Sequence, residues 1–188
     1  MSPARSSKRR RFRAARRTRR GRTSLEKVLK GIRLFATDVD GVLTDAGMYY
    51  TESGDELKKF NTRDGMGVKL LQGAGLVTAI LTKENTAIVE RRGAKLGIPE
   101  VHQGVEDKID VLRQLAEKYG LALEEIAYIG DDVNDLEALK AVGFSAAPAD
   151  GHPLVCQVVH HVCQKKGGEG AVREVADMIL VAQGAFGK

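Results

Sequence analysis

Residues 32–44 constrain this chain more than any other part of its sequence. An apolar run that includes Leu34 and Phe35 ends abruptly in two carboxylates, Asp38 and Asp40. Such a run is typical of a strand buried on both faces of a parallel sheet, and ligands bind at the carboxyl ends of such strands. If the pleat continued, both carboxylates would point to one side, where a divalent cation or a shared proton would relieve their repulsion. The alternative interpretation is a polar strand end followed by a simple Asp-Gly turn.

The rest of the chain alternates apolar runs with helical spacings, and its 188 residues suit one domain. The expected strands are residues 32–37, 76–81, 101–104, 125–129, 143–147 and 158–162. The expected helices are residues 66 to 73 or 75, 86–95, 106–119, 136–142 and 169–183. This alternation predicts an α/β fold, a Rossmann-like three-layer sandwich with a mostly parallel sheet. No transmembrane span is predicted.

A β-hairpin is expected directly after the two carboxylates. Residues 47–51 and 56–60 are β-prone and flank a Ser-Gly-Asp turn. Such a hairpin would project over the sheet edge as a flap. Because an isolated two-stranded hairpin is only marginally stable, we expect it to pack against something else, such as another subunit.

The positive charge is concentrated at the start of the chain. The formal net charge is +5, yet residues 1–24 hold eleven Lys and Arg and no acid, which leaves 19 basic and 25 acidic residues after them. We expect residues 1–24 to be a disordered basic arm and residues 25–188 to form the domain. The alternatives for the arm are contact with nucleic acid or an anionic membrane, a transit peptide, or an extension without a role in activity.

Two cysteines, Cys156 and Cys163, are the only ones in the chain. Their spacing and the nearby histidines do not match a zinc-binding pattern. Reduced thiols, together with the lack of an apolar signal segment, predict a cytoplasmic protein.

Polar side chains stand at successive strand and helix ends. They are, in chain order, Asp38 with Asp40, Thr82, Lys108, and Asp131 with Asp132 and Asp135. From Gly31 to the C-terminus, this order resembles the haloacid dehalogenase superfamily. The alternative for the last group is a helix cap, but three acids exceed what capping needs.

The resemblance implies a phosphatase that forms an aspartyl-phosphate intermediate. Asp38 would attack phosphorus, and Asp40 would protonate the leaving group and then deprotonate the hydrolytic water. Thr82 and Lys108 would hold the non-bridging phosphoryl oxygens.

The same resemblance implies Mg²⁺ as the cofactor. The ion would bind the side chains of Asp38 and Asp131 and the backbone carbonyl of Asp40. Asp132 and Asp135 would orient metal-bound waters or the catalytic lysine.

Within the superfamily, the chain is most similar to the capless sugar-acid phosphatases typified by 3-deoxy-D-manno-octulosonate 8-phosphate phosphatase. The similarity lies in residues 38–44, 60–65, 130–135 and 167–174. It implies a fold without a large cap domain and a homotetramer in which the hairpin flap of one subunit closes a neighbouring site. The implied substrate is a phosphorylated 2-keto-3-deoxy sugar acid of lipopolysaccharide biosynthesis, with the eight-carbon octulosonate as first choice.

The candidate substrate ligands are Glu84, Arg92, Lys95, Arg63 and Asp64. Lys83 and Glu84 stand where the group usually has Gly-Arg. Glu84, Arg92 and Lys95 resemble instead the relatives that act on deaminoneuraminate or N-acylneuraminate 9-phosphate. Arg92 would bind the substrate carboxylate, while Glu84 and Lys95 would pair. The alternative is a solvated helix face with ordinary ion pairs.

Two hypotheses from other classes compete with the enzyme. One is an inactive phosphatase scaffold that binds nucleic acid through the basic arm, and the other is a noncatalytic assembly partner, for example of a sugar-activating cytidylyltransferase. The first is disfavoured because every catalytic residue type is present, and for the second the sequence names no partner.

Overall fold

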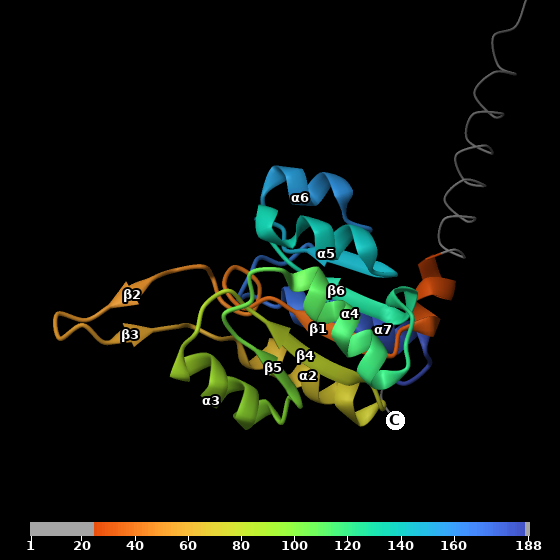
Figure 1. Cartoon of the computed structure of the whole chain (residues 1–188), viewed down its shortest axis with the longest axis horizontal. Coiled ribbons are helices and arrows are strands. Elements are labelled where there is room, and N and C mark those ends of the chain that lie inside the picture. The colour runs from red at the N-terminus through yellow and green to blue at the C-terminus, as the bar shows by residue number, and fades with distance from the viewer. Residues whose placement is uncertain (1–24, 187–188) are drawn as a thin grey trace, which may run out of the picture.

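A six-stranded parallel sheet forms the centre of the computed structural model, which describes residues 25–186. Its strands are β1 (Leu34–Thr37), β4 (Val77–Leu81), β5 (Glu100–His102), β6 (Ile126–Ile129), β7 (Phe144–Ala147) and β8 (His161–Val162). The spatial order is β5-β4-β1-β6-β7-β8, and every neighbouring pair is parallel. Figure 1 labels the first four of these strands. The strand that precedes Asp38 therefore lies in the middle of the sheet.

Helices cover both faces of the sheet. They are α2 (Thr62–Gly73), α3 (Ala87–Leu96) and α7 (Ala171–Ala182) on one face, and α4 (Lys108–Tyr119), α5 (Leu136–Ala141) and α6 (Pro153–Val158) on the other. Two 3₁₀ turns, η1 (Leu123–Glu125) and η2 (Val133–Asp135), flank β6. The alternation of side chains along β1 links the layers, because Phe35 packs in the core under α2 and α7, whereas Leu34 and Ala36 pack in the core under α4 and α5. The predicted Rossmann-like three-layer sandwich is confirmed.

The last helix closes the fold over its beginning. α7 packs against α2, where the buried Asp64 carboxylate accepts hydrogen bonds from the backbone N–H of Gly170 (3.2 Å) and of Arg173 (2.8 Å). At the other end of α7, the Gln183 side chain donates to the carbonyl of Ile32 at 2.8 Å. Both ends of the helix are thus fixed to the first third of the chain.

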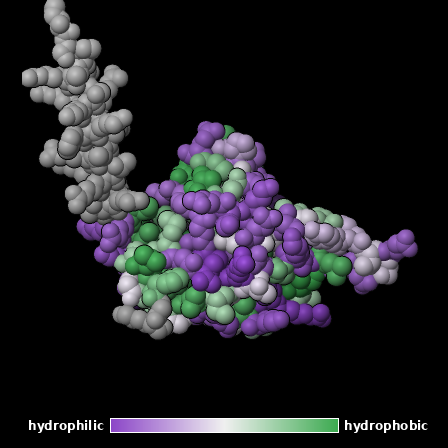
Figure 2. Space-filling model, turned by 180° about the vertical axis from the view of Figure 1, so that it is seen from behind, coloured by the Kyte–Doolittle hydropathy of each residue, from purple (hydrophilic) through white to green (hydrophobic). Residues whose placement is uncertain are grey.

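The hairpin is present but shorter than predicted. It consists of β2 (Tyr49–Tyr50) and β3 (Glu56–Leu57), and an antiparallel bridge between Thr44 and Phe60 closes its base. It projects away from the body, and its apolar side chains face solvent, with Tyr50 65% exposed (Figures 1 and 2). The chain has no large cap domain in the described residues, in agreement with the sequence prediction.

One predicted strand is largely wrong. Residues 153–158 form α6, so the strand expected at residues 158–162 is reduced to β8. Pro153 occupies the first turn, and His152 accepts a hydrogen bond from the N–H of Leu154 at 3.2 Å, which together start the helix. The β-branched residues Val155 and Val158 favour a strand locally, but tertiary packing overrides that preference.

α2 begins earlier than predicted, at Thr62 rather than residue 66. Asn61 caps it by accepting a hydrogen bond from the N–H of Arg63 at 2.8 Å.

Residues 1–24, predicted to be a disordered basic arm, lie outside the described residues. In the described part, no helix has the length and apolar character needed to cross a membrane.

Candidate active site

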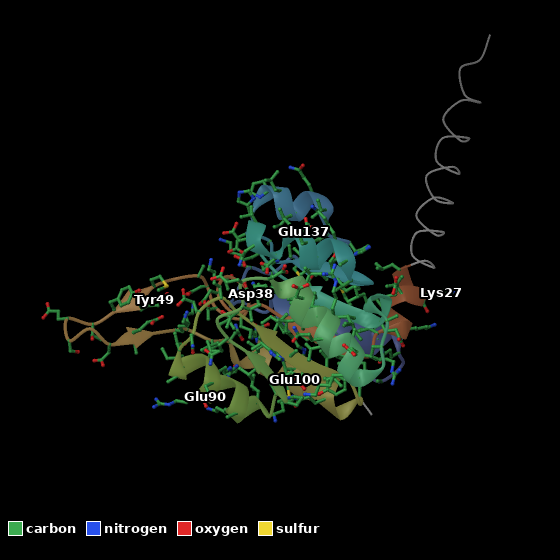
Figure 3. The ribbon with its side chains drawn as sticks, viewed as in Figure 1. Lys27, Asp38, Tyr49, Glu90, Glu100 and Glu137 are labelled. Carbon is green, nitrogen blue, oxygen red and sulfur yellow. The ribbon has the colours of Figure 1, made fainter. Side chains whose placement is uncertain are left out.

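The loops after β1, β4 and β6 meet at one edge of the sheet because β1 lies between the other two strands. Asp38, Thr82 and Asp131 follow these strands, and with Asp40 and Glu84 they line a cavity of about 250 Å³. Figure 3 places Asp38 at the end of the sheet that faces the hairpin. A larger hollow of about 480 Å³ lies at the opposite edge, but no carboxylate is among the described residues that line it. The carboxylates that follow the strands are therefore gathered at the carboxyl edge of the sheet.

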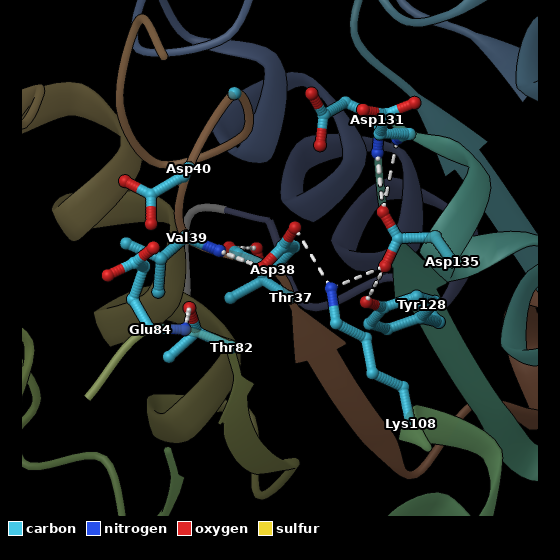
Figure 4. Close-up of polar contacts among 12 residues, drawn as sticks. Thr37, Asp38, Val39, Asp40, Thr82, Glu84, Lys108, Tyr128, Asp131 and Asp135 are labelled. Carbon is cyan, nitrogen blue, oxygen red and sulfur yellow. Dashed lines mark hydrogen bonds and ion pairs between the residues drawn. The ribbon is translucent and has the colours of Figure 1, made fainter. Parts of the chain in front are cut away.

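Lys108 is the buried cation of this edge. Its side chain is 1% exposed, and its ammonium lies 3.0 Å from Asp38 Oδ2 and 2.6 Å from Asp135 Oδ1 (Figure 4). Burial alone would lower the pKa of Lys108, but the charges of the two carboxylates outweigh burial and raise it. A lysine at a helix N-terminus opposes the helix dipole, and these two carboxylates offset that penalty.

Asp135 holds the site together from behind. Its side chain accepts hydrogen bonds from Lys108 Nζ and from the Tyr128 hydroxyl, both at 2.6 Å, and from the N–H groups of Asp131 (3.0 Å) and Asp132 (3.2 Å). The carboxylate is completely buried. With four donors already bound, Asp135 orients the lysine and the loop after β6.

Asp38 and Asp131 carry more negative charge than the site neutralises. Burial raises the pKa of Asp38 to about 7, with Lys108 opposing the rise and Asp135 adding to it. Burial also raises the pKa of Asp131 to about 8, and the charges of Asp38, Asp135 and Asp132 add to it. Crowded, desolvated carboxylates hold protons unless a cation replaces them.

These residues fit a divalent cation. Asp38, Asp131 and Asp135 can each bring a carboxylate oxygen within 4.8 Å of the others. Because Asp135 is already bound to four donors, the side chains of Asp38 and Asp131 are the ones available to a metal ion. Oxygen ligands of this kind suit Mg²⁺.

Gly41 allows the loop after β1 to approach the loop after β6. Its φ is +82°, and a β-carbon there would overlap the Asp131 carboxylate. A β-carbon at Gly167 would likewise overlap the carbonyl of Gly41. The Asp-Gly turn is therefore part of the site rather than only a strand end.

Asp40 lies in this turn and not in a continued strand, because β1 ends at Thr37. Its Oδ1 is 2.6 Å from the ammonium of Lys58, which comes from the base of the hairpin. Sequence reasoning missed Lys58. No local signal indicates its role, because Lys58 follows β3 and its contact with Asp40 joins residues 18 positions apart in the sequence.

The predicted substrate ligands are only partly brought together. Glu84 lines the cavity, but Arg92 does not. The Arg92 guanidinium donates to the carbonyl of Asn61 at 3.0 Å and lies 5.1 Å from the centre of the Phe60 ring. Arg92 thus supports the start of α2.

The predicted pairing of Glu84 with Lys95 is wrong. Lys95 is exposed in the last turn of α3, and no ion pair joins it to Glu84 in the part of the chain that the structure describes. Glu84 precedes the N-cap of the helix, Thr86, so the helical spacing that brings side chains together does not extend to it.

Arg63 and Asp64 also lie outside the cavity. Asp64 is the fully buried cap of α7 described above, and burial raises the pKa of this carboxyl despite its backbone hydrogen bonds. Arg63 lines a separate hollow with Lys165, Glu169 and Arg173. In this subunit, neither residue belongs to the site around Asp38.

Comparison with known sequences gives consistent matches. The sequence model of the haloacid dehalogenase-like hydrolases matches residues 77–175. The 3-deoxy-D-manno-octulosonate 8-phosphate phosphatase KdsC of Escherichia coli K12 is 44% identical over 155 residues, which cover 82% of each chain.

Solved structures match the fold as well. A probable phosphatase of the yrbi family from Pseudomonas syringae superposes with a TM-score of 0.85 at 45% identity, covering 87% of this chain and 93% of that one. The octulosonate 8-phosphate phosphatase of Moraxella catarrhalis, in complex with magnesium, phosphate and KDO, superposes with a TM-score of 0.84 at 42% identity. The match covers 86% of this chain and 92% of that one. The cobalt-bound Haemophilus influenzae enzyme superposes with a TM-score of 0.81 at 42% identity, and the match covers 86% of this chain and 96% of that one.

Proposed function

Because the chain belongs to the haloacid dehalogenase-like hydrolases, in the group of 3-deoxy-D-manno-octulosonate 8-phosphate phosphatases, we propose that it hydrolyses this sugar-acid phosphate. The observation that supports the proposal most is the buried cluster at the end of β1, where Asp38 lies 3.0 Å from Lys108 and close to Asp131. The similarity to the M. catarrhalis enzyme that holds KDO and phosphate supports the eight-carbon substrate.

In this proposal, Asp38 is the nucleophile. One of its carboxylate oxygens forms a bond to phosphorus as the bond from phosphorus to the sugar oxygen breaks, and Asp40 gives its proton to that oxygen. Asp40 then takes a proton from a water whose oxygen attacks phosphorus, and the bond between phosphorus and the Asp38 oxygen breaks. Lys108 and Thr82 bind the phosphoryl oxygens throughout.

The cofactor in this proposal is Mg²⁺. The carboxylates of Asp38 and Asp131 and the carbonyl of Asp40 would hold the ion, which would neutralise charge on the phosphoryl group. The raised pKa values of both carboxyl groups support a cation here, as does the magnesium in the M. catarrhalis enzyme.

The hairpin supports a proposal about assembly. Tyr49, Tyr50 and Leu57 are between 43% and 65% exposed on a two-stranded arm that has little else to stabilise it. We infer that the hairpin closes the site of a neighbouring copy in a homotetramer. Light scattering of the purified protein tests this, and a monomer at micromolar concentration would contradict it.

A cytoplasmic location is also proposed. Cys156 and Cys163 are both free, which suits a reducing compartment.

A second candidate substrate is the 9-phosphate of deaminoneuraminate or N-acylneuraminate. It is favoured by the position of Glu84 in the cavity wall, where the octulosonate group usually has arginine. Glu84 does not pair with Lys95 in the described residues, and this weakens the case for the nine-carbon substrates.

The deciding experiment measures phosphate release from the octulosonate 8-phosphate and from both 9-phosphates, each with Mg²⁺ and with EDTA. We expect turnover only with the metal, with the highest kcat/KM for the eight-carbon substrate. Preference for a 9-phosphate would change the substrate, and no turnover of any of them would refute the proposed function.

A further inference from the structure

Lys58 is an unusual residue for its place in the fold. It follows β3 on the hairpin, whose other side chains are mostly exposed, yet its own side chain is only 1% exposed. The next residue, Lys59, is 60% exposed and pairs with Asp45 at the hairpin base. Because burying an ammonium is costly without a partner, the position of Lys58 calls for an explanation.

The partners of Lys58 supply one. Its ammonium is 2.6 Å from Asp40 Oδ1 and 3.5 Å from Glu56 Oε1. The other side-chain contact of Asp40 Oδ1 is the Thr44 hydroxyl at 3.4 Å, and Asp40 Oδ2 is buried without a partner in residues 25–186. Lys58 is therefore the one close donor to the Asp40 carboxyl group in the described structure.

The backbone fixes this contact from both sides. The bridge between Thr44 and Phe60 joins the end of the turn that carries Asp40 to the segment after β3 that carries Lys58. Lys58 stands two residues before that bridge, so its side chain reaches Asp40 over a short, closed path. The orientation of the carboxyl group thus depends on the hairpin base.

We propose that Lys58 is a positioning residue that holds the Asp40 carboxyl group in line with the leaving-group oxygen and, in the second step, with the attacking water. This inference rests on the proposed phosphatase activity. A proton-transfer group loses much of its effect when it is free to rotate away, because the reaction needs donor and acceptor in a narrow geometry. The competing explanation is that Lys58 only neutralises Glu56 and stabilises the hairpin.

Leaving groups of different basicity separate these explanations. The alkoxide that leaves a sugar-acid phosphate needs a proton, whereas p-nitrophenolate leaves readily without one. The kcat/KM value reports the steps up to departure of the leaving group and not the later attack of water, which is the same for both substrates. We therefore expect Lys58→Met to lower kcat/KM about 100-fold with the octulosonate 8-phosphate but at most about threefold with p-nitrophenyl phosphate. Lys59→Met removes the same charge from the neighbouring position and should change neither kcat/KM value by more than about twofold.

A double-mutant cycle adds a second readout. If Lys58 acts through Asp40, then Lys58→Met should add almost nothing to the loss caused by Asp40→Asn. Equal losses of kcat/KM with the two substrates, or additive losses in the cycle, would overturn the inference.

Thermal unfolding monitors whether each variant is folded. Should the methionine variant not fold, Lys58→Arg keeps the charge but displaces it, and it should show a smaller loss with the same dependence on the leaving group. Absence of hydrolysis by the unmodified enzyme would refute the proposed function itself, which distinguishes that failure from failure of the Lys58 inference.

Discussion

The two walls of the cavity are built in opposite ways. At the sheet edge, the charged side chains of Asp38, Lys108 and Asp135 are at most 8% exposed and contact one another. The other wall consists of Ala46 and Met48, which lead into a hairpin of two-residue strands with exposed apolar side chains. Behind this wall, the buried Lys58 contacts Asp40. The wall at the sheet edge is part of the core, whereas the hairpin side is joined to the body only at the base of the hairpin.

This difference indicates that the sheet edge and the hairpin have different functions. Charges held in a buried, water-poor edge interact strongly and need no rearrangement during the reaction. An exposed hairpin can instead change its contacts with substrate or with another subunit without disturbing the packing of the core. Substitutions should therefore have large effects on chemistry at the first wall and smaller effects on access and assembly at the second.

The largest effect is expected for Asp38→Asn. Removal of the proposed nucleophile should lower kcat at least about 10⁴-fold, measured as phosphate release. Folding should be unaffected or improved, because the amide avoids the cost of burying this carboxylate. Thermal unfolding provides the control, and retention of more than about 1% of the activity would contradict the assignment.

A smaller loss is expected for Asp135→Asn. This change removes one of the two carboxylates that hold the Lys108 ammonium. We expect a loss of about 100-fold in kcat and of about 3 kcal/mol in the free energy of unfolding. The change breaks a buried ion pair and, unlike the change at Asp38, also disturbs the buried hydrogen bonds from the Tyr128 hydroxyl and two backbone N–H groups. Glu137→Gln, which breaks an exposed pair with Lys140, should leave stability within about 0.5 kcal/mol and serves as the matched control. Equal stability losses for both variants would show that burial does not decide the cost of breaking an ion pair in this protein.

The hairpin should be more tolerant. Replacing Tyr50 and Leu57 with serine removes exposed apolar side chains, so the free energy of unfolding of one subunit should change by less than about 1 kcal/mol. We expect about a tenfold loss of activity and a lower mass by light scattering. Val181→Ser, at a residue of α7 that is 64% exposed, should change neither quantity. Unchanged mass and activity in the hairpin variant would contradict the proposed role of the arm.

The smallest effect concerns pH and metal. The folded-state pKa values of Asp38 and Asp131, about 7 and about 8, lie above the ordinary value of 3.8. The metal-free folded protein therefore binds more protons than the unfolded chain in this range, and its stability falls as pH rises. In EDTA, we expect Tm to drop by a few degrees between about pH 5 and about pH 8.

Mg²⁺ should reduce this drop, because the cation stabilises both carboxylates in their charged form. A Tm that rises with pH in EDTA over the same range would show that the carboxylates at the sheet edge are not destabilised by burial.

The sheet, and the meeting of Asp38, Thr82 and Asp131 at one edge of it, were predictable from sequence because their signals are local. An apolar run buried on both faces is a local signal for a strand of a parallel sheet. Asp38 and Thr82 follow such runs directly, and Asp131 follows one after a single glycine. Strand order then brings them together without further information.

Contacts between distant segments were not predictable in this way. Asp64 caps a helix that begins more than a hundred residues later, and nothing near it in the sequence indicates that partner. Lys58 reads as an exposed lysine of a hairpin until the bridge at Thr44 folds it over Asp40. The α6 helix was missed because its valines favour strands, although Pro153 marked its start.

The attachment of α7 to the beginning of the domain has a consequence for synthesis on the ribosome. The helix that covers α2, takes the Asp64 cap and ties Gln183 to Ile32 is the last of the described elements to be translated. Until it emerges, one face of the catalytic strand has no complete cover. We expect that a nascent chain halted before residue 171 has every residue of the catalytic cluster and still no activity.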